Sequence, residues 1–326
     1  MDGYNKIIAI GASTGGLRAL KQMLPDLPAD LPAAVFVVMH IGAGESVLPR
    51  VLGSHCKLPV QHATDGAPIE SGKVFVAPPD HHLVLEADRM RLSRSARENH
   101  ARPAIDPLLR SAAVAYRERV IGVILTGNLD DGTVGLQAIK AYGGMAIVQD
   151  PDEAEASSMP LSASRFVDTD YCLPLADIAP TLARLAVQAN AEEQCTNHHR
   201  VIDMENLVAL TDHIDEKQLD AIASRSTQTC PECGGTVWTI DGSNPLRFRC
   251  HTGHAYTAQS MLEHRNDAAE QAVWAAVRAL HERYTLLRRL ADGAKEHGYD
   301  KQAEEYEASA ETAADHAEAL RKMITS

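Results

Sequence analysis

The 326-residue sequence has no apolar stretch of roughly 18 or more residues, and no basic N-terminal region followed by a long apolar segment and a small-residue cleavage site. We therefore expect neither a transmembrane helix nor a signal peptide, and predict a cytoplasmic protein that is not embedded in a membrane. Positive charge is also scarce, with 31 Lys and Arg against 44 Asp and Glu and a formal net charge of −13. Nucleic-acid binding needs clustered Lys and Arg, so we expect no nucleic acid among the partners. The six cysteines are then expected to be thiols or metal ligands rather than disulfides.

The first 190 residues alternate short apolar runs with helical patterns. The runs are rich in Val and Ile and are bounded by Gly, Pro or Asp. They are Ile7–Ile10, Val35–Met39, Val74–Ala77, Val120–Leu125 and Met145–Val148. Such runs suit strands that are buried on both faces of a parallel sheet.

Helical patterns lie between the predicted strands, at Leu17–Leu24, Pro107–Tyr116 and Gly132–Tyr142. This alternation predicts a doubly wound, mostly parallel α/β sheet of the Rossmann-like, three-layer kind. Residues 82–94 alternate around a turn, which predicts an antiparallel hairpin on one edge of the sheet. We expect a large domain over 1–190, a connector over 191–228 with a weak helical stretch near Asp215–Ser224, a cysteine module over 229–256 and a helical hairpin over 257–326.

A glycine-rich turn, Gly11–Gly16, follows the first predicted strand and carries Ser13 at its tip. The shape suits either a serine nucleophile on a sharp strand-to-helix turn or a phosphate cradle at a helix N-terminus. A dinucleotide-binding loop should have glycine at position 13 and an acidic residue after the second strand, where this chain has His40. No Lys follows the glycines, so a nucleoside-triphosphate loop is not favoured either.

The polar residues at the ends of the neighbouring strands favour the nucleophile interpretation. His40 comes after the second strand, and Asp130 and Asp131 come after the strand Val120–Leu125. The carboxyl ends of parallel strands lie side by side, so Ser13, His40 and one aspartate of this pair can meet there. A serine needs a base, and an imidazole base needs an orienting acid. The chain order Ser, His, Asp differs from the Ser, Asp, His of α/β-hydrolases.

Five motifs occur in order within residues 5–190. They are Ile-Gly-Ala-Ser-Thr-Gly-Gly at 10–16, Val-Val-Met-His-Ile at 37–41, Ala-Pro-Pro-Asp-His-His-Leu at 77–83, Arg-Pro-Ala-Ile-Asp-Pro-Leu-Leu-Arg-Ser-Ala-Ala at 102–113 and Leu-Thr-Gly-Asn-Leu-Asp-Asp-Gly at 125–132. Together they resemble the catalytic domain of the chemotaxis protein-glutamate methylesterases, the CheB family. That family hydrolyses γ-glutamyl methyl esters on chemoreceptor helices and deamidates certain receptor glutamines. The resemblance implies that methyl-accepting chemotaxis receptors are the partners.

The resemblance also implies roles for single residues. Ser13 matches the nucleophile and His40 the base, and Asp131, directly before the glycine, matches the orienting acid in preference to Asp130. The backbone N–H groups of Thr14 and Asn128 match the oxyanion donors. The family usually has Met-Gly where this chain has Asn128 and Leu129, but backbone donation survives a side-chain change. No catalytic cofactor is implied. Family members in chemotaxis usually carry an N-terminal receiver domain, which we expect this protein to lack.

The cysteine module contains Cys230-Pro231-Glu232-Cys233 and, after sixteen intervening residues, Cys250-His251-Thr252-Gly253-His254. Two such knuckles complete a tetrahedron, which predicts a structural zinc in a zinc ribbon. Cys230, Cys233 and Cys250 are the first three predicted ligands. The fourth is His254 or His251, and the longer gap favours His254. A redox pair is the alternative, although it would need a helix after the first cysteine. Cys56, Cys172 and Cys195 are expected to be plain thiols.

Two amphipathic stretches come after the cysteine module. Apolar residues recur at alternating steps of three and four, from Val273 to Ala291 and again from Ala303 to Ile324, with a break at Gly298. These heptad seams predict an antiparallel helical hairpin that packs on its own protein, binds a partner or forms an oligomer. A receptor methyltransferase or another signalling protein is a candidate for that partner.

Basic residues concentrate between the predicted hairpin and the next helix. They are Arg89, Arg91, Arg94, Arg97, Arg102 and Arg110. They either form a solvated face or steer acidic receptor helices to the site. Two other functions stay open at this point: a hydrolase of another protein or small-molecule ester, and a non-catalytic scaffold that binds through the C-terminal extension.

Overall fold

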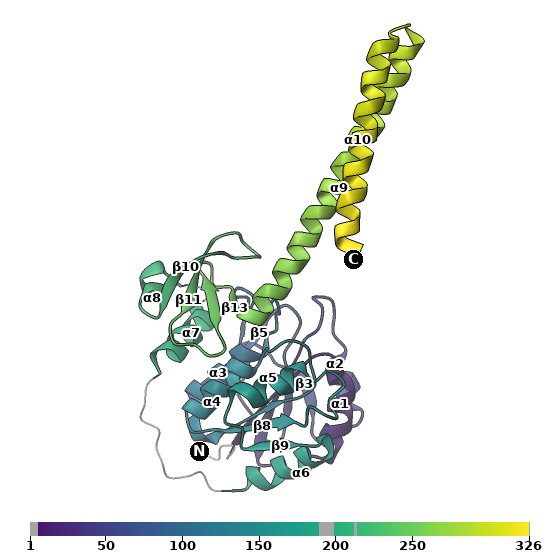
Figure 1. Ribbon diagram of the computed structural model, residues 1–326. Coiled ribbons are helices and arrows are strands. Elements are labelled where there is room, and N and C mark those ends of the chain that lie inside the picture. Colours follow the sequence, from purple (N-terminus) through teal and green to yellow (C-terminus); the bar gives the residue numbers. More distant parts are fainter. Residues whose placement is uncertain (1–5, 189–198, 212–213, 326) are drawn as a thin grey trace. The chain divides into compact units, whose positions relative to one another are not determined.

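The computed structural model describes residues 6–188, 199–211 and 214–325 (Figure 1). The chain forms two units, Met1–Met261 and Leu262–Ser326, each with its own internal contacts. The first contains the predicted α/β sheet and the cysteine module, and the second contains most of the helical extension. No helix in the described ranges combines the length and the apolar character that crossing a membrane requires.

The first unit is built on a seven-stranded sheet in the order β3-β4-β2-β1-β7-β8-β9, in which every pairing is parallel. The strands are β1 (Lys6–Ala12), β2 (Ala33–Met39), β3 (Val60–His62), β4 (Val74–Val76), β7 (Val120–Ile124), β8 (Met145–Gln149) and β9 (Tyr171–Leu173). All five strands predicted from the sequence are present. The two that escaped prediction, β3 and β9, are three-residue edge strands.

The sheet separates two hydrophobic cores, and successive residues of a strand alternate between them. On β1, Ile7 and Ala9 face one core, whereas Ile8 and Ile10 face the other. Burial of both faces explains why these strands are continuous apolar runs. This alternation confirms the doubly wound fold class, with helices above and below the sheet (Figure 1).

Six α-helices cover the sheet. They are α1 (Gly16–Met23), α2 (Leu48–Gly53), α3 (Ile105–Tyr116), α4 (Thr133–Ala141), α5 (Ser158–Phe166) and α6 (Leu175–Ala186). Short 3-10 turns, η1 (Leu24–Asp26) and η2 (Arg117–Arg119), follow α1 and α3. Helices α3, α4 and α5 bury their apolar sides in the core of Ile7, and α1 and α6 in the core of Ile8. Helix α1, which follows β1, and helix α4, which follows β7, therefore lie on opposite faces of the sheet.

The predicted hairpin is present as β5 (His82–Glu86) and β6 (Arg89–Ser93), but its predicted position on the edge of the main sheet is wrong. The two strands form a separate antiparallel sheet. Leu83 and Leu85 of β5 enter the same core as α3, and the Ser111 hydroxyl of α3 accepts the Leu85 N–H at 2.9 Å. The hairpin therefore packs over a helix instead of extending the sheet.

A second, four-stranded antiparallel sheet contains β10 (Ala223–Thr229), β11 (Thr236–Ile240), β12 (Arg247–Cys250) and β13 (Ala255–Thr257). With the first turn of the helix after β13, it forms residues 223–261, here called the four-stranded module. The segment expected to be a connector carries α7 (Arg200–Thr211), α8 (Glu216–Asp220) and β10. Val208, Leu219 and Trp238 share one small core, so α7 and α8 pack against this sheet.

A buried network of ion pairs joins the four-stranded module to the α/β domain. Glu98 accepts from Arg110 of α3 at 2.7 Å and from Arg249 of β12 at 3.2 Å. Glu205 of α7 accepts from Arg249 at 3.1 Å and from Arg247 at 2.7 Å. Removing one partner would leave an uncompensated buried charge, which costs several kcal/mol (about 3–5). The module is therefore held in a defined position within the first unit.

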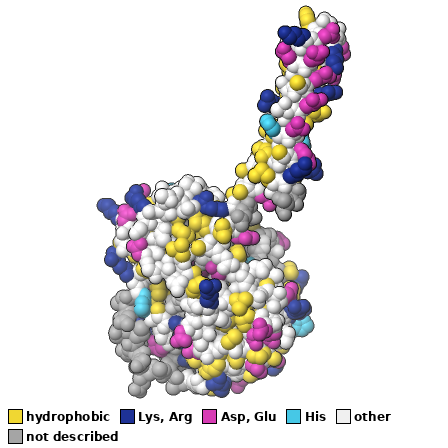
Figure 2. Space-filling view, in the orientation of Figure 1, with side chains coloured by type: hydrophobic (Ala, Val, Ile, Leu, Met, Phe, Trp, Pro, Cys, Tyr) yellow, Lys and Arg dark blue, Asp and Glu magenta, His cyan; other side chains and the backbone are white. Residues whose placement is uncertain are grey.

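The helical extension consists of α9 (Ala258–Glu296) and α10 (Asp300–Thr325), joined at Gly298, whose φ is 76°. Ala291, Ala303, Ala310 and Ala317 of the predicted seams are buried, because small side chains let the two helices approach closely. The predicted seam position Ile324 lies outside the residues whose side chains are described. Acidic and basic side chains are intermixed along the visible face of this unit (Figure 2).

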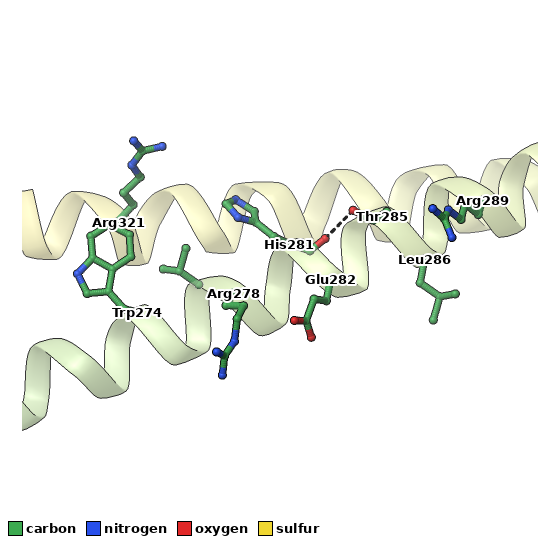
Figure 3. Close-up of a pocket in the computed structure, with 9 residues that line it drawn as sticks. Trp274, Arg278, His281, Glu282, Thr285, Leu286, Arg289 and Arg321 are labelled. Atoms are coloured by element: carbon green, nitrogen blue, oxygen red, sulfur yellow. Dashed lines mark hydrogen bonds between the residues drawn. The ribbon is translucent and has the colours of Figure 1, made fainter.

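The helical unit also holds a hollow of about 530 Å³. Trp274, His281 and Leu286 of α9 and Arg321 of α10 are among the residues that line it (Figure 3). Thr285 donates its hydroxyl to the His281 carbonyl at 3.0 Å, as part of the helix itself. All the lining residues belong to the helical unit.

Candidate active site

Three polar side chains lie just beyond three adjacent strands at the carboxyl edge of the sheet. Ser13 follows β1, His40 follows β2 and Asp131 lies just beyond β7, and β1 is the strand between the other two. Backbone pairing brings these ends to one level, since the His40 N–H donates to the Ala12 carbonyl at 3.1 Å and the Leu125 N–H to the Gly11 carbonyl at 2.9 Å.

The three side chains form one hydrogen-bonded series. The Ser13 Oγ lies 3.0 Å from His40 Nδ1, and His40 Nε2 lies 2.7 Å from Asp131 Oδ2. The His40 side chain is 23% exposed and that of Asp131 only 3%. The serine end of the series is therefore open to a reactant, while the carboxylate end is shielded from water. A serine, an imidazole and a buried acid in this order can generate a nucleophilic alkoxide.

The Asp131 carboxylate is held by four donors. Oδ2 accepts from His40 and from the Ile105 N–H at 2.7 Å, and Oδ1 accepts from Asn99 Nδ2 at 3.1 Å and from the Asp106 N–H at 3.2 Å. Burial alone would raise the pKa of Asp131. The hydrogen bond and positive charge that His40 supplies, with the Ile105 and Asn99 donors, bring that pKa below its ordinary value. Asp131 is thus an ionised acceptor fixed in place.

The neighbouring Asp130 has different partners. It is buried and accepts a hydrogen bond from the Thr257 hydroxyl of β13 at 2.8 Å, whereas His40 pairs with Asp131. Burial, with the nearby charge of Asp131, raises the pKa of Asp130 to about 6, although the Thr257 hydrogen bond opposes the shift. Of the two adjacent aspartates, Asp131 is the one that continues the series from Ser13.

Asp106 is a further buried carboxyl that the sequence analysis did not single out. It lies in the first turn of α3, and its Oδ1 accepts from the Gly132 N–H at 3.0 Å and from the Gly135 N–H. Burial, followed by the charge of Asp131, raises the pKa of Asp106. Its position directly before the predicted helix Pro107–Tyr116 was the available signal, but an acidic residue at a helix N-terminus usually serves only the helix end.

The turn around Ser13 leaves two backbone donors free. Among the described residues, neither the Thr14 N–H nor the Asn128 N–H has a hydrogen-bond partner. The two residues are adjacent in space, because Asn128 Nδ2 lies 3.2 Å from Thr14 Oγ1. A Cβ on Gly127 would lie 2.9 Å from the Ser13 Cβ, so glycine is what lets the two loops approach. The arrangement can accept a negatively charged oxygen beside Ser13.

A cavity of about 450 Å³ opens beside His40 and is also lined by Arg97, Asn99 and Arg102. Arg102 is paired with Asp80 at 2.6 Å, and Arg94 is paired with the same carboxylate. Arg97 is exposed and has no ion pair within the described ranges. Arg110, which the sequence analysis grouped with these residues, is buried against Glu98, so it belongs to no basic surface.

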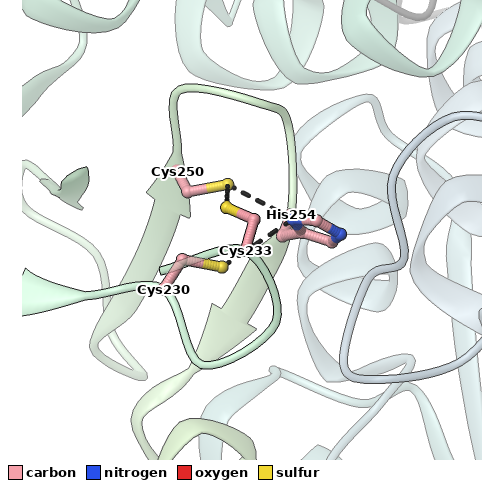
Figure 4. Close-up of side chains that lie close together, drawn as sticks. All are labelled: Cys230, Cys233, Cys250 and His254. Carbon is pink, nitrogen blue, oxygen red and sulfur yellow. Dashed lines mark hydrogen bonds between the residues drawn. The ribbon is translucent and has the colours of Figure 1, made fainter. Parts of the chain in front are cut away.

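The four-stranded module brings four predicted metal ligands together, namely Cys230, Cys233, Cys250 and His254 (Figure 4). All their ligand atoms lie within 4.8 Å of one another. The Cys233 and Cys250 sulfurs are 3.8 Å apart, and His254 Nδ1 is 3.4 Å from Cys250 Sγ and 3.7 Å from Cys230 Sγ. A zinc tetrahedron with bonds of about 2.3 Å to sulfur and about 2.0–2.1 Å to nitrogen has edges of roughly 3.8 Å and 3.5 Å. The cluster therefore has the dimensions of a zinc site.

The surroundings of the cluster separate the two candidate histidines. Glu232 Oε2 lies 3.2 Å from His254 Nε2, the partner that fixes the ring with Nδ1 toward the sulfurs. The His251 ring lies instead against Gly235, where an added Cβ would be 1.9 Å from it. Cys56 and Cys172 are free cysteines outside the cluster, and Cys195 lies outside the described residues.

The parallel sheet with a hydrogen-bonded serine, histidine and aspartate at its carboxyl edge is the arrangement found in α/β proteins that hydrolyse esters. The chain order Ser, His, Asp differs from the Ser, Asp, His of the α/β-hydrolase fold. Comparison with protein families is more specific. Residues 8–182 match the family described as CheB methylesterase, and the chain belongs to that family.

Relatives agree with this assignment. A protein of Leptospira interrogans is 42% identical over 189 residues, which are 57% of this chain and 97% of the relative. A Thermotoga maritima relative named protein-glutamate methylesterase/protein-glutamine glutaminase is 40% identical over 55% of this chain and 54% of its own length. The crystal structure of the Thermotoga maritima CheB methylesterase catalytic domain superposes with a TM-score of 0.54 at 39% identity, over 56% of this chain and 98% of that one. The family match lies within the α/β domain, and this chain spans about half the length of the Thermotoga relative.

Proposed function

We propose that this protein hydrolyses γ-glutamyl methyl esters on the cytoplasmic helices of methyl-accepting chemotaxis receptors, and that it deamidates receptor glutamines at the same site. The observation that carries the proposal is the series from Ser13 through His40 to Asp131, with distances of 3.0 and 2.7 Å. The family match over residues 8–182, which include all three residues, supports the substrate class, as do the printed name of the Thermotoga relative and its 40% identity.

The geometry suggests how the residues share the reaction. Ser13 Oγ attacks the ester carbonyl carbon while its proton passes to His40 Nδ1. The Thr14 and Asn128 N–H groups donate to the oxyanion that forms on the carbonyl oxygen. When the intermediate collapses, the C–O bond to the methoxy group breaks and His40 returns the proton to the leaving methanol. Water, deprotonated by the same imidazole, then attacks the acyl carbon. The bond to Ser13 Oγ breaks, the imidazolium returns its proton to that oxygen, and the glutamate carboxylate leaves; Asp131 stabilises the imidazolium in both halves.

The cavity beside His40 is the proposed place of the receptor helix. Its size of about 450 Å³ admits a glutamyl methyl ester with part of a helix turn, and the exposed Arg97 adds positive charge to an otherwise acidic chain. Chemoreceptor methylation segments present carboxylates, so this charge would favour encounter at low ionic strength. The substrate is intracellular, and a cytoplasmic location is part of the proposal.

We further propose that Cys230, Cys233, Cys250 and His254 bind a structural zinc ion. Four protein ligands leave no open position for chemistry. A redox pair would require a helix after its first cysteine. Here glycines and strand β11 follow Cys233, which disfavours the redox alternative. Cys230→Ser should reduce bound zinc from about one ion per chain to almost none, whereas Cys172→Ser, an exposed cysteine outside the cluster, should retain it. Zinc bound equally by both variants would refute the assignment.

The helical unit is proposed to bind a protein of the same signalling system, and a receptor methyltransferase is one candidate. Trp274 and Leu286 are 43% and 59% exposed and line the same hollow of about 530 Å³, which could hold an apolar side chain of a partner. This part of the proposal is independent of the chemistry at Ser13.

Methanol release from methylated receptors tests the activity directly. The wild-type protein should release methanol and Ser13→Ala should not. No release from either protein would reject the receptor as substrate. Reaction of the wild type with a small ester, but not with the receptor, would indicate a hydrolase for a different ester. A serine-specific fluorophosphonate that labels neither protein would instead support a non-catalytic scaffold.

A further inference from the structure

The side-chain amide of Asn99 lies between the candidate active site and the four-stranded module. Its Nδ2 donates to Asp131 Oδ1 at 3.1 Å and to Asp106 Oδ2 at 3.0 Å. Its Oδ1 accepts from the Thr257 N–H at 3.2 Å and from the Ser260 hydroxyl at 2.9 Å. Both amide protons and both oxygen lone pairs are used. The orientation of the amide is fixed, because the ionised Asp131 carboxylate can only accept and the Thr257 N–H can only donate.

The backbone of the loop that carries Asn99 is also held by the module. Asn99 and His100 have φ values of 49° and 63°, in the left-handed region that non-glycine residues rarely adopt. The Asn99 N–H donates to the Ala255 carbonyl at 2.8 Å, and the Ala255 N–H donates to the Arg97 carbonyl at 3.3 Å. Strand β13 therefore holds the backbone of this loop in place through two hydrogen bonds.

The same loop reaches the cysteine cluster. His100 Nε2 lies 3.0 Å from the Ser260 carbonyl, and His100 Nδ1 lies 3.2 Å from Glu232 Oε1. The other oxygen of Glu232 faces His254 of the cluster at 3.2 Å. Each residue from Arg97 to His100 thus contacts the module, either through its backbone or through its side chain.

A second contact approaches the site from the other direction. The Thr257 hydroxyl donates to Asp130 at 2.8 Å, and Asp130 is the residue immediately before Asp131. Thr257 therefore contacts Asp130 through its hydroxyl and Asn99 through its backbone N–H. Thr257 and Ser260 do not line the cavity beside His40.

We propose that Asn99 is a positioning residue for Asp131, and that the four-stranded module supports the catalytic series through two contacts. The Thr257 N–H and the Ser260 hydroxyl fix Asn99, and the Thr257 hydroxyl, which Thr257→Val removes, fixes Asp130 directly before Asp131. This inference rests on the proposed function, since it concerns how the esterase site is kept in its reactive geometry. The four-stranded module would then act directly on turnover, through hydrogen bonds no longer than 3.2 Å.

The experiment compares four full-length variants: Asn99→Ala, Thr257→Val, Thr257→Ser and Gln137→Ala. Thr257→Ser keeps the hydroxyl that Thr257→Val removes. Gln137→Ala is the matched control, because Gln137 also contacts the module. Its Nε2 donates to the Asn244 carbonyl of the module and to the Phe166 carbonyl, and among the described residues it makes no hydrogen bond with Ser13, His40 or Asp131. Each protein is measured for kcat and KM with a small ester, for the rate constant and final extent of fluorophosphonate labelling at Ser13, and for bound zinc.

We expect kcat to fall about 100-fold in Asn99→Ala, in the range for loss of an outer partner of a functional residue, and about 10-fold in Thr257→Val. The labelling rate constant should fall in parallel, while the final extent of labelling and the zinc content stay those of the wild type. The KM of Thr257→Val should stay within about twofold, because Thr257 does not line the cavity. Thr257→Ser and Gln137→Ala should behave as wild type.

The readouts separate positioning from a general loss of structure. A variant that merely unfolds in part would label to a lower final extent at an unchanged rate per site, and that result would overturn the proposal. Wild-type kcat and labelling rate in both Asn99→Ala and Thr257→Val would also overturn it while leaving the proposed function standing. Failure of the wild type to label at Ser13 would remove the proposed function and this inference together.

Discussion

Replacement of Asp131 by Asn tests the central assumption about the site, that a buried ionised carboxylate stabilises the imidazolium of His40. The two groups are 2.7 Å apart, and the Asp131 side chain is 3% exposed. At that separation and an effective dielectric constant of about 20, two unit charges attract by about 6 kcal/mol, which corresponds to roughly four orders of magnitude in rate.

The substitution also disturbs the local hydrogen bonds. Asp131 accepts from four donors. The NH2 group of an asparagine there would point at one or more of the Ile105, Asp106 and Asn99 N–H groups, and those N–H groups would lose their acceptor. We therefore expect Asp131→Asn to lower kcat/KM by about 10⁴-fold, as loss of the orienting acid does in serine hydrolases generally.

The assay is methanol release or small-ester hydrolysis, with active sites titrated by a fluorophosphonate. The matched control is Asp130→Asn, since Asp130 is also buried and acidic but contacts Thr257 rather than His40. An asparagine oxygen can still accept the Thr257 hydroxyl, so the control should lose less than about tenfold. A loss below tenfold in Asp131→Asn, or equal losses in the two variants, would refute the assigned role.

Three further predictions concern the turn, the buried ion pairs and the cavity. Gly127→Ala should lower kcat at least tenfold in a folded protein, because its Cβ would lie 2.1 Å from Met159 Sδ and 2.9 Å from the Ser13 Cβ; a wild-type kcat would contradict this. Burial raises the pKa of Glu205, but its arginine partners bring it down to about 2, so its contribution to stability is complete above the unfolded pKa of about 4.3 and is lost as pH falls toward 2. Urea unfolding should therefore show that the free energy of unfolding falls between pH 5 and pH 2.5 by about 2–3 kcal/mol more in the wild type than in Glu205→Gln. Equal falls in the two proteins would contradict this prediction. Arg97→Glu should lower kcat/KM for receptors at low salt by about tenfold and leave a small neutral ester unaffected, whereas equal effects on both substrates would exclude steering.

Much of the α/β domain is predictable from local pattern. The strands β1, β2, β4, β7 and β8 are buried on both faces, so their sequences are continuous apolar runs that stand out from their surroundings. The edge strands β3 and β9 are three residues long and partly exposed, and nothing in their sequences distinguishes them from loops. The hairpin of β5 and β6 was recognisable from its alternation, but its place depended on packing against α3.

The candidate site divides in the same way. Ser13, His40 and Asp131 follow strands that the sequence predicts, and parallel neighbours must bring their carboxyl ends together. The Cys-x-x-Cys spacing likewise indicates a metal knuckle from a few adjacent residues. Asn99 and Thr257 are 158 residues apart in the chain, and neither lies in a motif that indicates the other.

The sequence by itself therefore determined the doubly wound sheet, the glycine turn with Ser13, the strand ends that carry His40 and the aspartate pair, and the cysteine cluster. These features depend on short-range periodicity, on turn chemistry and on ligand spacing. The sequence also favoured Asp131 over Asp130 and His254 over His251, and the tertiary structure supplies the contacts of Asp131 with His40 and of His254 with the cysteines. Only the tertiary structure decided that Asn99 connects the acid to the four-stranded module. The physical reason is that a hydrogen bond is set by distances of about 3 Å, and these distances exist only after separate segments have packed together.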